Sequence, residues 1–315
     1  MVTDTDPTTA VDLSRLPARL KRLGVEEILQ SCIQHETSTE ITLLRLIFAS
    51  RDAAHLESLM QLVGEFAKSS NQSTLQEICS LYEENREGCA RIMSLPEPKP
   101  LTKSMTPGAR IERLRESFDK WVEEDPGFSV ALYTFGNPRL LHKTSEEVVN
   151  VLDDWGVLGS AVDALQIGCG AGRIEALLCQ KVHLACGIDI SANMIRAARQ
   201  QAGNLENVRF HECSGRDLAL FEANSFDLVY AVDSFPYIVE VGEALVDCHF
   251  AEVARVLRDG GHFVILQYSY RDDAARDLDD VRQKAAAYGY AIVREAVTPF
   301  KIWDGVGYHL RKKAS

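Results

Sequence analysis

The spacing of apolar residues divides the chain into two kinds of segment. From Leu13 to about Met93, apolar side chains recur at helical spacing, as in Leu56, Leu59 and Val63. This period predicts amphipathic helices, and we expect a bundle of roughly four of them. After an extended stretch, a further amphipathic helix carries Ile111 on its apolar face and ends before residue 125.

From residue 162 onward, short apolar runs alternate with helical patterns. The runs predict strands at 164–167, 183–188, 208–212, 228–232 and 262–268, with two late strands near 291–297 and 308–311. Helices are expected after Gly172, Ser191, Gly242 and Arg271, and Thr144-Ser-Glu-Glu is a predicted capping box for a helix that precedes the first strand. Alternation of strand and helix predicts an α/β fold, with a doubly wound and mostly parallel sheet.

The amino-acid composition also marks the boundary between the helical segment and the α/β segment. Prolines alternate with other residues from Pro96 to Pro100, which is typical of an extended spacer. We therefore divide the chain into a disordered N-terminus at 1–12, a helical accessory domain at 13–94, a linker at 95–107 and an α/β domain at 108–315. The helical segment is open to three interpretations: substrate selection, homodimerisation, or a purely structural accessory.

The net charge, the lack of a long apolar run and the cysteine pattern disfavour nucleic acid, membranes and metal ions as partners. The 315 residues carry a net charge of −12, which disfavours nucleic acid as the default substrate. The sequence has no long apolar run, and residues 1–6 lack the basic and apolar regions of a signal peptide, so no membrane association is expected. The eight cysteines are scattered without a CxxC pair, which favours reduced thiols in a cytoplasmic protein and no metal site.

One glycine-rich stretch carries the chemistry. Gly168, Gly170 and Gly172 alternate directly after the first predicted strand, and Asp189 ends the second. Glycines allow a tight turn and close approach of a ligand, and an acid about twenty residues on suits ribose hydroxyls. The nicotinamide and flavin fingerprint, GxGxxG, is disfavoured because Arg173 stands where its third glycine would be.

Four ordered motifs resemble those of the class I S-adenosylmethionine-dependent methyltransferases. They are the glycine loop, the stretch 187–194, the turn at 224–230, and the helix, Gly-Gly turn and strand at 254–266. The resemblance covers about 148–310 and implies a Rossmann-like, seven-stranded sheet with an antiparallel last pair, and S-adenosylmethionine as cofactor. The implied cofactor-binding residues are Gln166, Gly168, Cys169, Gly170, Gly172, Asp189, Ile190, Met194, Ser214, Gly215, Arg216 and Ala231.

Two positions depart from the family pattern. Gln166 replaces the acid that usually lies by the methionine end of the cofactor, and an amide accepts a hydrogen bond without neutralising an ammonium. Cys213 and Ser214 replace a Gly-Asp pair near adenine, where Asp217 is an alternative partner.

The acceptor side is predicted from the loop after the fourth strand. Asp233, Tyr237 and His249 are the predicted catalytic residues, with Ser234, Tyr268, Tyr270 and His142 as further possibilities. His249 has a competing interpretation as a packed histidine inside a helix. Tyr133 or Phe135 is expected either to wall the site or to pack under a loop.

The sequence thus predicts in-line transfer of a methyl group to a small-molecule acceptor, with an oxygen or nitrogen nucleophile. Two alternatives stay open. One is a non-catalytic cofactor-binding scaffold, and the other is a protein methyltransferase that docks its partner on the helical domain.

Overall fold

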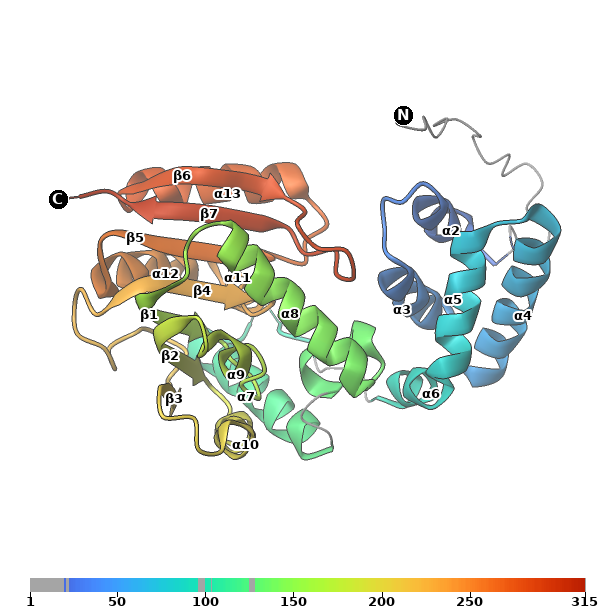
Figure 1. Ribbon diagram of the computed structural model, residues 1–315, viewed down its shortest axis with the longest axis horizontal. Helices are drawn as coiled ribbons and strands as arrows, with labels where there is room; N and C mark the ends of the chain where they lie inside the picture. Colours follow the sequence, from blue (N-terminus) through green and yellow to red (C-terminus); the bar gives the residue numbers. More distant parts are fainter. Residues whose placement is uncertain (1–19, 21–22, 96–99, 103, 125–127, 315) are drawn as a thin grey trace. The chain divides into compact units, whose positions relative to one another are not determined.

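The computed structural model (Figure 1) describes residues 20, 23–95, 100–102, 104–124 and 128–314. The prediction of disorder at 1–12 and most of the proline spacer lie outside these residues. The chain separates into two compact units, Met1–Leu95 and Pro96–Ser315, and the division falls at the start of the predicted linker.

The first unit is helical throughout its described part. Its helices are α2 (Glu26–Ile33), α3 (Thr39–Ala49), α4 (Ala53–Ser70), α5 (Ser73–Glu84) and α6 (Arg86–Ser94), one more than the apolar pattern predicted. Ser38 and Asp52 cap α3 and α4 by accepting backbone N–H groups. Apolar side chains including Leu29, Leu43, Leu46, Leu56, Val63 and Ile78 form its core.

Two long helices precede the sheet in the second unit. Helix α7 (Pro107–Glu124) ends before residue 125 as predicted. The short turns η2 (Phe128–Val130) and η3 (Leu132–Thr134) then lead to α8 (Pro138–Asp154). The predicted capping box at Thr144 is wrong. The Asn137 side chain caps α8 upstream with Pro138 in its first turn, and the Thr144 hydroxyl donates to the carbonyl of Leu141 inside the helix.

Seven strands form one mixed sheet in the order β3-β2-β1-β4-β5-β7-β6. The strands are β1 (Gly159–Ile167), β2 (Val182–Asp189), β3 (Val208–Glu212), β4 (Phe226–Val232), β5 (Leu257–Leu266), β6 (Tyr290–Val297) and β7 (Gly307–Lys312). Strands β1 to β5 pair in parallel, while β7 lies between β5 and β6 and is antiparallel to both. The predicted parallel core and antiparallel late pair are therefore both present.

The predicted boundaries differ in kind at two places. Residues 235–241, predicted as part of a loop, form a short helix, and the Gly-Gly pair is not a turn. Strand β5 begins at Leu257 and runs through Gly260 and Gly261, so the glycines form a register irregularity against β4 instead of a turn before the strand. A side chain at Gly261 would meet the carbonyl of Arg258 at 2.9 Å, which explains why the close strand approach needs glycine there.

Helices cover both faces of the sheet. They are α9 (Glu175–Leu178), α10 (Ala192–Ala202), α11 (Phe235–Val241), α12 (Glu243–Val256) and α13 (Ala274–Ala287). In Figure 1, α8 lies on the near side of the sheet and α12 and α13 on the far side. The main core packs the sheet against α12 and α13, with Phe235, Phe250 and Phe263 fully buried in it. In the described chain, no helix combines the length and apolarity that a membrane crossing needs.

Candidate active site

The backbone of residues 168–170, which we call the glycine cradle, forms a tight loop where β1 ends. The amides of Gly168 and Cys169 both donate to the carbonyl of Ile188, at 2.8 and 2.9 Å, which ties the loop to the end of β2. Gly168 and Gly170 have φ of 71° and 53°. A Cβ on Gly168 would lie 2.3 Å from the Cβ of Ser234, and one on Gly170 would lie 2.8 Å from Val130. Glycine is therefore required for conformation and for space.

Asp189 is fixed by the same loop. Its Oδ2 accepts the amide of Gly170 at 2.9 Å, and its Oδ1 accepts the amide of Ser191 at 2.9 Å. Burial raises the pKa of Asp189 to about 6, although these two hydrogen bonds act to lower it. Each carboxylate oxygen keeps a lone pair that a ligand hydroxyl could use.

A cavity opens at the carboxyl ends of β1, β2 and β4. It contains about 1080 Å³ free of protein atoms, including its open mouth. Eleven of the fifteen residues predicted for cofactor binding or catalysis line it: Gln166, Gly168, Cys169, Gly170, Asp189, Ile190, Met194, Gly215, Asp233, Tyr237 and His249. Asp217, the alternative partner for adenine, lines it as well. The strand-end position is where ligands bind in doubly wound sheets.

Four predicted residues lie outside the cavity lining. Gly172 faces inward, since a Cβ there would lie 2.6 Å from Phe210. Ala231 is fully buried in β4. Ser214 accepts the amide of Arg216 through its hydroxyl, which makes a local turn in which neither side chain lines the cavity.

The two predicted aromatic walls also lie outside it. Tyr133 is buried and stacks on Trp303 with ring centroids 6.3 Å apart, and Phe135 is buried beside it in the sequence. From this segment it is Val130 that lines the cavity. The interpretation of these aromatics as packing residues therefore fits the structure better.

Gln166 supplies an unsatisfied acceptor. The residue is 2% exposed at the end of β1, and its Oε1 has no hydrogen-bond partner in the described structure. Buried polar atoms are nearly always satisfied, and an unpaired one is costly. This oxygen therefore marks a place where a bound donor would complete the structure.

Asp233 lies on the acceptor side and has strained backbone. Its φ is 55°, in the left-handed region, and its amide donates to the carbonyl of Leu266 at 2.9 Å. The hydroxyl of Tyr270 donates to its Oδ1 at 2.7 Å. Burial raises the pKa of Asp233 to about 7, while the Tyr270 hydrogen bond and the Arg173 charge act in the opposite direction. A carboxyl poised near neutral pH is suited to proton transfer.

Aromatic rings surround this carboxyl. Tyr237 is perpendicular to Phe118, with centroids 5.0 Å apart, and to Tyr270, with centroids 5.7 Å apart. Phe118 comes from α7 and Tyr237 from α11, so the wall is assembled from segments far apart in the sequence. Such walls exclude water and present electron-rich faces that favour a cationic centre.

His249 occupies a different part of the cavity lining. It is buried in α12, where its Nδ1 bonds to the carbonyl of Leu245 at 2.9 Å, and burial lowers its pKa. Its neighbour Cys248 contacts the carbonyl of Arg216, so this part of α12 faces the loop after β3. The neutral imidazole is thus placed beside the predicted adenine region.

The remaining polar possibilities have structural partners. His142 is exposed and lies 3.4 Å from Glu146 on the surface of α8. Tyr268 is buried and stacks on Phe235. Ser234 lines the cavity, and its hydroxyl donates to the carbonyl of Ile167.

Helix α7 forms one wall of the cavity and is tied down at both ends. Near its C-terminus, Asp119 accepts the Ser191 hydroxyl at 2.6 Å and the amide of Asn193 at 3.2 Å. Near its N-terminus, Arg110 donates to the carbonyl of Val241 at 2.7 Å. The apolar face of α7 that the sequence predicted lines the cavity through Ile111, Leu114 and Phe118.

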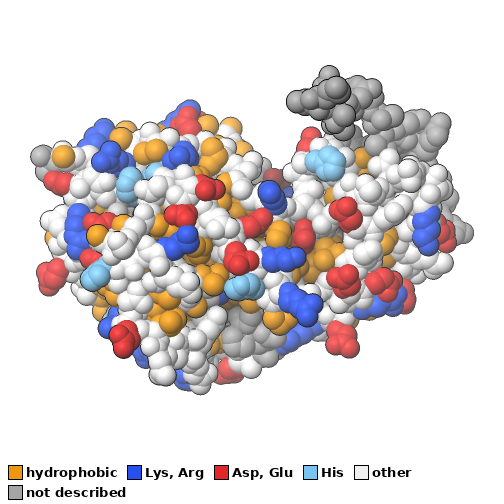
Figure 2. Space-filling model, in the orientation of Figure 1, with side chains coloured by type: hydrophobic (Ala, Val, Ile, Leu, Met, Phe, Trp, Pro, Cys, Tyr) orange, Lys and Arg blue, Asp and Glu red, His pale blue; other side chains and the backbone are white. Residues whose placement is uncertain are grey.

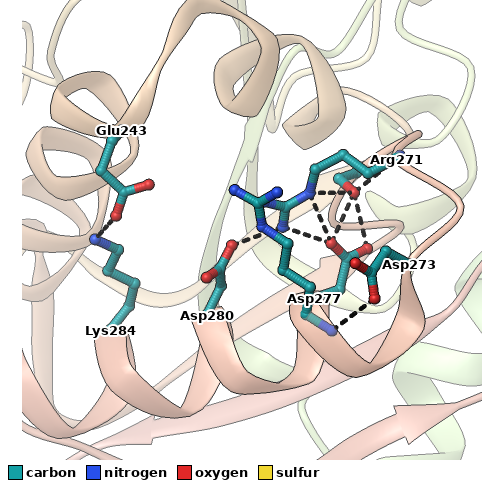
Figure 3. A network of polar contacts seen from close by, with 8 residues as sticks. Glu243, Arg271, Asp273, Asp277, Asp280 and Lys284 are labelled. Carbon is teal, nitrogen blue, oxygen red and sulfur yellow. Dashed lines mark hydrogen bonds and ion pairs between the residues drawn. The ribbon is translucent and has the colours of Figure 1, made fainter.

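An ion-pair network holds the loop that carries Tyr270 (Figure 3). Arg271 bridges Asp277 and Asp280 of α13 at 2.5 and 2.6 Å, and Ser269 donates to Asp277 at 2.8 Å. Further along α13, Lys284 pairs with Glu243 of α12. The network therefore fixes the residues on either side of Tyr270.

The architecture and the glycine cradle agree with known proteins. Residues 165–265 match the family described as a methyltransferase domain. This segment is a methyltransferase domain. The class I, S-adenosylmethionine-dependent resemblance is thereby confirmed. No cluster of metal-ligating side chains is present among the described residues of the chain.

Individual relatives match the methyltransferase domain in part. The uncharacterized methyltransferase YcgJ of Bacillus subtilis is 30% identical over 115 residues, which is 36% of this chain and 43% of that protein. The 2-methyl-6-phytyl-1,4-hydroquinone methyltransferase of Synechocystis is 24% identical over 175 residues, 51% of this chain and 53% of that protein. The chain spans about half the length of these curated relatives.

A solved structure shares the fold. Phosphoethanolamine N-methyltransferase 1 of Haemonchus contortus, in complex with phosphoethanolamine and S-adenosylhomocysteine, superposes with a TM-score of 0.51 at 16% identity. The match covers 67% of this chain and 50% of that protein. At this identity the likeness concerns the fold alone.

The residues present fit the cofactor of this class. The loop at Gly168 and Gly170 has room for no Cβ against the cavity-lining side chains of Ser234 and Val130. The Asp189 carboxylate has lone pairs for ribose hydroxyls, and the Gln166 oxygen lacks a hydrogen-bond donor. Each of these features is the complement of one part of S-adenosylmethionine.

Proposed function

We propose that this protein transfers the methyl group of S-adenosylmethionine to a small-molecule acceptor with an oxygen or nitrogen nucleophile. The observation that carries the proposal is the position of Asp233, a carboxyl with a pKa of about 7 that lines the same cavity as the glycine cradle. The cofactor supplies an electrophilic methyl carbon when bound.

The cradle and its neighbours would hold the cofactor. The loop at Gly168 and Gly170 admits it closely, Asp189 accepts its ribose hydroxyls, and Gln166 accepts its ammonium. Cys213 and Gly215 line the cavity after β3, where the adenine would lie, and the neutral His249 faces the same loop.

Asp233 would act on the acceptor. Its Oδ1 accepts from Tyr270 and its Oδ2 has no partner among the described residues, so Oδ2 is available for the acceptor's O–H or N–H. The ionised carboxylate takes the acceptor's proton as the nucleophile attacks. Phe118 and Tyr237 align the acceptor and exclude water.

The surface and the cavity favour a small acceptor. On the face shown in Figure 2, basic side chains are interspersed with acidic ones, which gives no continuous track for a phosphate backbone on that face. We propose a cytoplasmic enzyme whose helical unit is an accessory domain that forms a homodimer.

Two measurements test the proposal. Calorimetric titration with S-adenosylmethionine, S-adenosylhomocysteine and NADH should show binding of the first two only. Acceptor screening by mass spectrometry should then find a product 14 mass units heavier, and Asp233→Asn should lower kcat about 100-fold or more without changing cofactor affinity. His142→Gln is the matched control, since it replaces an exposed side chain outside the cavity lining.

The outcomes separate the alternatives. Binding of NADH alone would overturn the cofactor class. Cofactor binding with no turnover on any small molecule would favour a scaffold, and methylation of a co-purified protein would favour a protein methyltransferase.

A further inference from the structure

Arg173 is a buried cation in the cavity wall. It is 9% exposed and lines the cavity two residues before α9 begins. Its Nη1 donates to the Ser145 hydroxyl at 2.8 Å, and the Tyr133 hydroxyl is a further neutral neighbour. The sequence offered Arg173 only as an argument against a nicotinamide site.

No carboxylate neutralises this guanidinium. Among the described residues, Arg173 bonds to the neutral Ser145 hydroxyl and forms no ion pair with a carboxylate, although its charge acts to lower the pKa values of Glu175 and Asp233 through space. Burial raises the pKa of Glu175 to about 8, so at neutral pH that carboxyl is mostly uncharged. Buried charges in folded proteins are almost always paired, because leaving one unpaired is expensive.

An unsatisfied acceptor lines the same cavity. Gln166 is the second-last residue of β1, directly before the glycine loop, and Arg173 follows that loop. One residue lacks a donor and the other lacks an anion. A ligand that carries an ammonium and a carboxylate on one carbon, as an α-amino acid does, would satisfy both.

We propose that the Arg173 guanidinium binds the carboxylate of the cofactor's amino-acid end, while the Gln166 oxygen accepts a hydrogen bond from its ammonium. The assignment rests on the proposed function and deepens it. Because Gln166 is neutral, it attracts the ammonium weakly, so most of the selectivity for this end of the ligand falls to Arg173. A carboxylate on the acceptor is the competing source of the anion.

The test compares two ligands that differ by one group. S-Adenosylhomocysteine has the carboxylate, and 5′-deoxy-5′-(3-aminopropylthio)adenosine lacks only that group. By calorimetry, wild-type protein should bind the former about tenfold or more tightly, as expected for a charge-assisted pair. In Arg173→Met this ratio should fall to about one, with affinity for the amine ligand changed by less than about twofold.

Matched variants keep the test decisive. Arg209→Met replaces an exposed arginine whose hydrogen bonds, among the described residues, go to the carbonyls of Glu206 and Val208, and it should keep the wild-type ratio. Gln166→Met should weaken both ligands alike and keep the ratio. If Arg173→Met does not fold, Arg173→Lys is the test variant. Lysine cannot form the two parallel hydrogen bonds that a guanidinium makes with a carboxylate, so the ratio of the two affinities should still fall several-fold.

An unchanged ratio in the folded Arg173 variant would overturn the inference and leave the cofactor site standing, with the anion assigned to the acceptor. Failure of wild-type protein to bind either ligand would instead overturn the proposed function on which the inference rests.

Discussion

The hydroxyl of Tyr270 donates a hydrogen bond to Oδ1 of Asp233 over 2.7 Å and so joins the end of β4 to the loop after β5. The bond favours the ionised carboxylate, and it opposes the effect of burial on the pKa of Asp233. The pKa of Asp233, the proposed base, is therefore lowered by Tyr270, a residue that is 57% exposed.

Removing that hydroxyl should shift the pH dependence of catalysis. In Tyr270→Phe the pKa of Asp233 should rise above 7, because the charged form loses a donor. We expect the acidic limb of the kcat/KM profile to move up by roughly one pH unit, a value reduced from that of a fully buried bond because Tyr270 is exposed. Measurement of the profile between pH 5 and 9 checks this, and Tyr288→Phe, at a surface hydroxyl bonded to Asp247, is the control. An unmoved limb would contradict the role of Asp233.

Cofactor affinity should depend on the charge of Asp189. Its pKa of about 6 places ionisation just below neutral pH, so affinity for S-adenosylhomocysteine should be full above pH 7 and decline as the pH falls through 6. Asp189→Asn keeps the shape of the side chain but loses the charge, and should bind about tenfold more weakly at pH 7.5 with a flatter pH dependence. Calorimetry at pH 5.5 and 7.5 gives both quantities. Equal affinities in the two proteins at pH 7.5 would refute the ribose assignment.

Stability should fall with rising pH because of Glu175. The carboxyl is fully buried with Oε2 unpartnered, and burial raises its pKa to about 8 from an unfolded value of about 4.3. The native state holds this proton longer than the unfolded state, so the free energy of unfolding decreases between pH 4.3 and 8. Each pKa unit is worth about 1.4 kcal/mol, and Glu175→Gln should be a few kcal/mol more stable than wild type at pH 9.

Urea unfolding at pH 5 and pH 9 measures that difference. Glu206→Gln replaces an exposed acid and should change stability equally at both pH values. A Glu175→Gln variant with the wild-type pH dependence would mean that the carboxyl is ionised in the native protein.

The network at Arg271 should matter for both stability and catalysis. Asp277→Asn removes the charge that Arg271 meets at 2.5 Å, with both side chains mostly buried, and should cost about 1 to 3 kcal/mol of unfolding free energy. Because the loop at Tyr270 loses its anchor, kcat should fall more than KM rises. Arg282→Met breaks the exposed pair between Arg282 and Glu295, and should leave both the free energy of unfolding and the kinetics nearly unchanged. Equal losses in the two variants would show that the anchor has no special role.

Local sequence patterns predicted the strands and the glycine loop because each of these features depends on residues that are close together in the sequence. The runs around β1 to β4, the glycine loop and Asp189 form a strand, a turn and a strand end that depend on their own spacing. The capping box at Thr144 failed because Asn137 and Pro138 already start the helix upstream, and a mid-helix Thr bonds back to the preceding turn.

The rest of the site depends on tertiary contacts that sequence spacing does not encode. Phe118, Val130 and Arg173 reach the cavity from α7, η2 and the turn before α9. Nothing in the neighbourhoods of Phe118 and Val130 distinguishes them from core residues, and the position of Arg173 after the glycine loop does not show what it faces. Arg216 was predicted to bind the cofactor and does lie in the loop after β3, but its side chain does not line the cavity.

The attachment of α7 couples ligand exchange to the opening of a helix. Ser191 caps α10 by accepting the amide of Met194 and donates its hydroxyl to Asp119 of α7, so one side chain links the cavity wall to the helix after Asp189. Any ligand that fills the cavity and touches α7 binds the docked arrangement more tightly than the released one. By linkage, such a ligand holds the wall in place by RT ln(1 + [L]/Kd), and the amides of α7 should exchange hydrogen more slowly as the cavity fills.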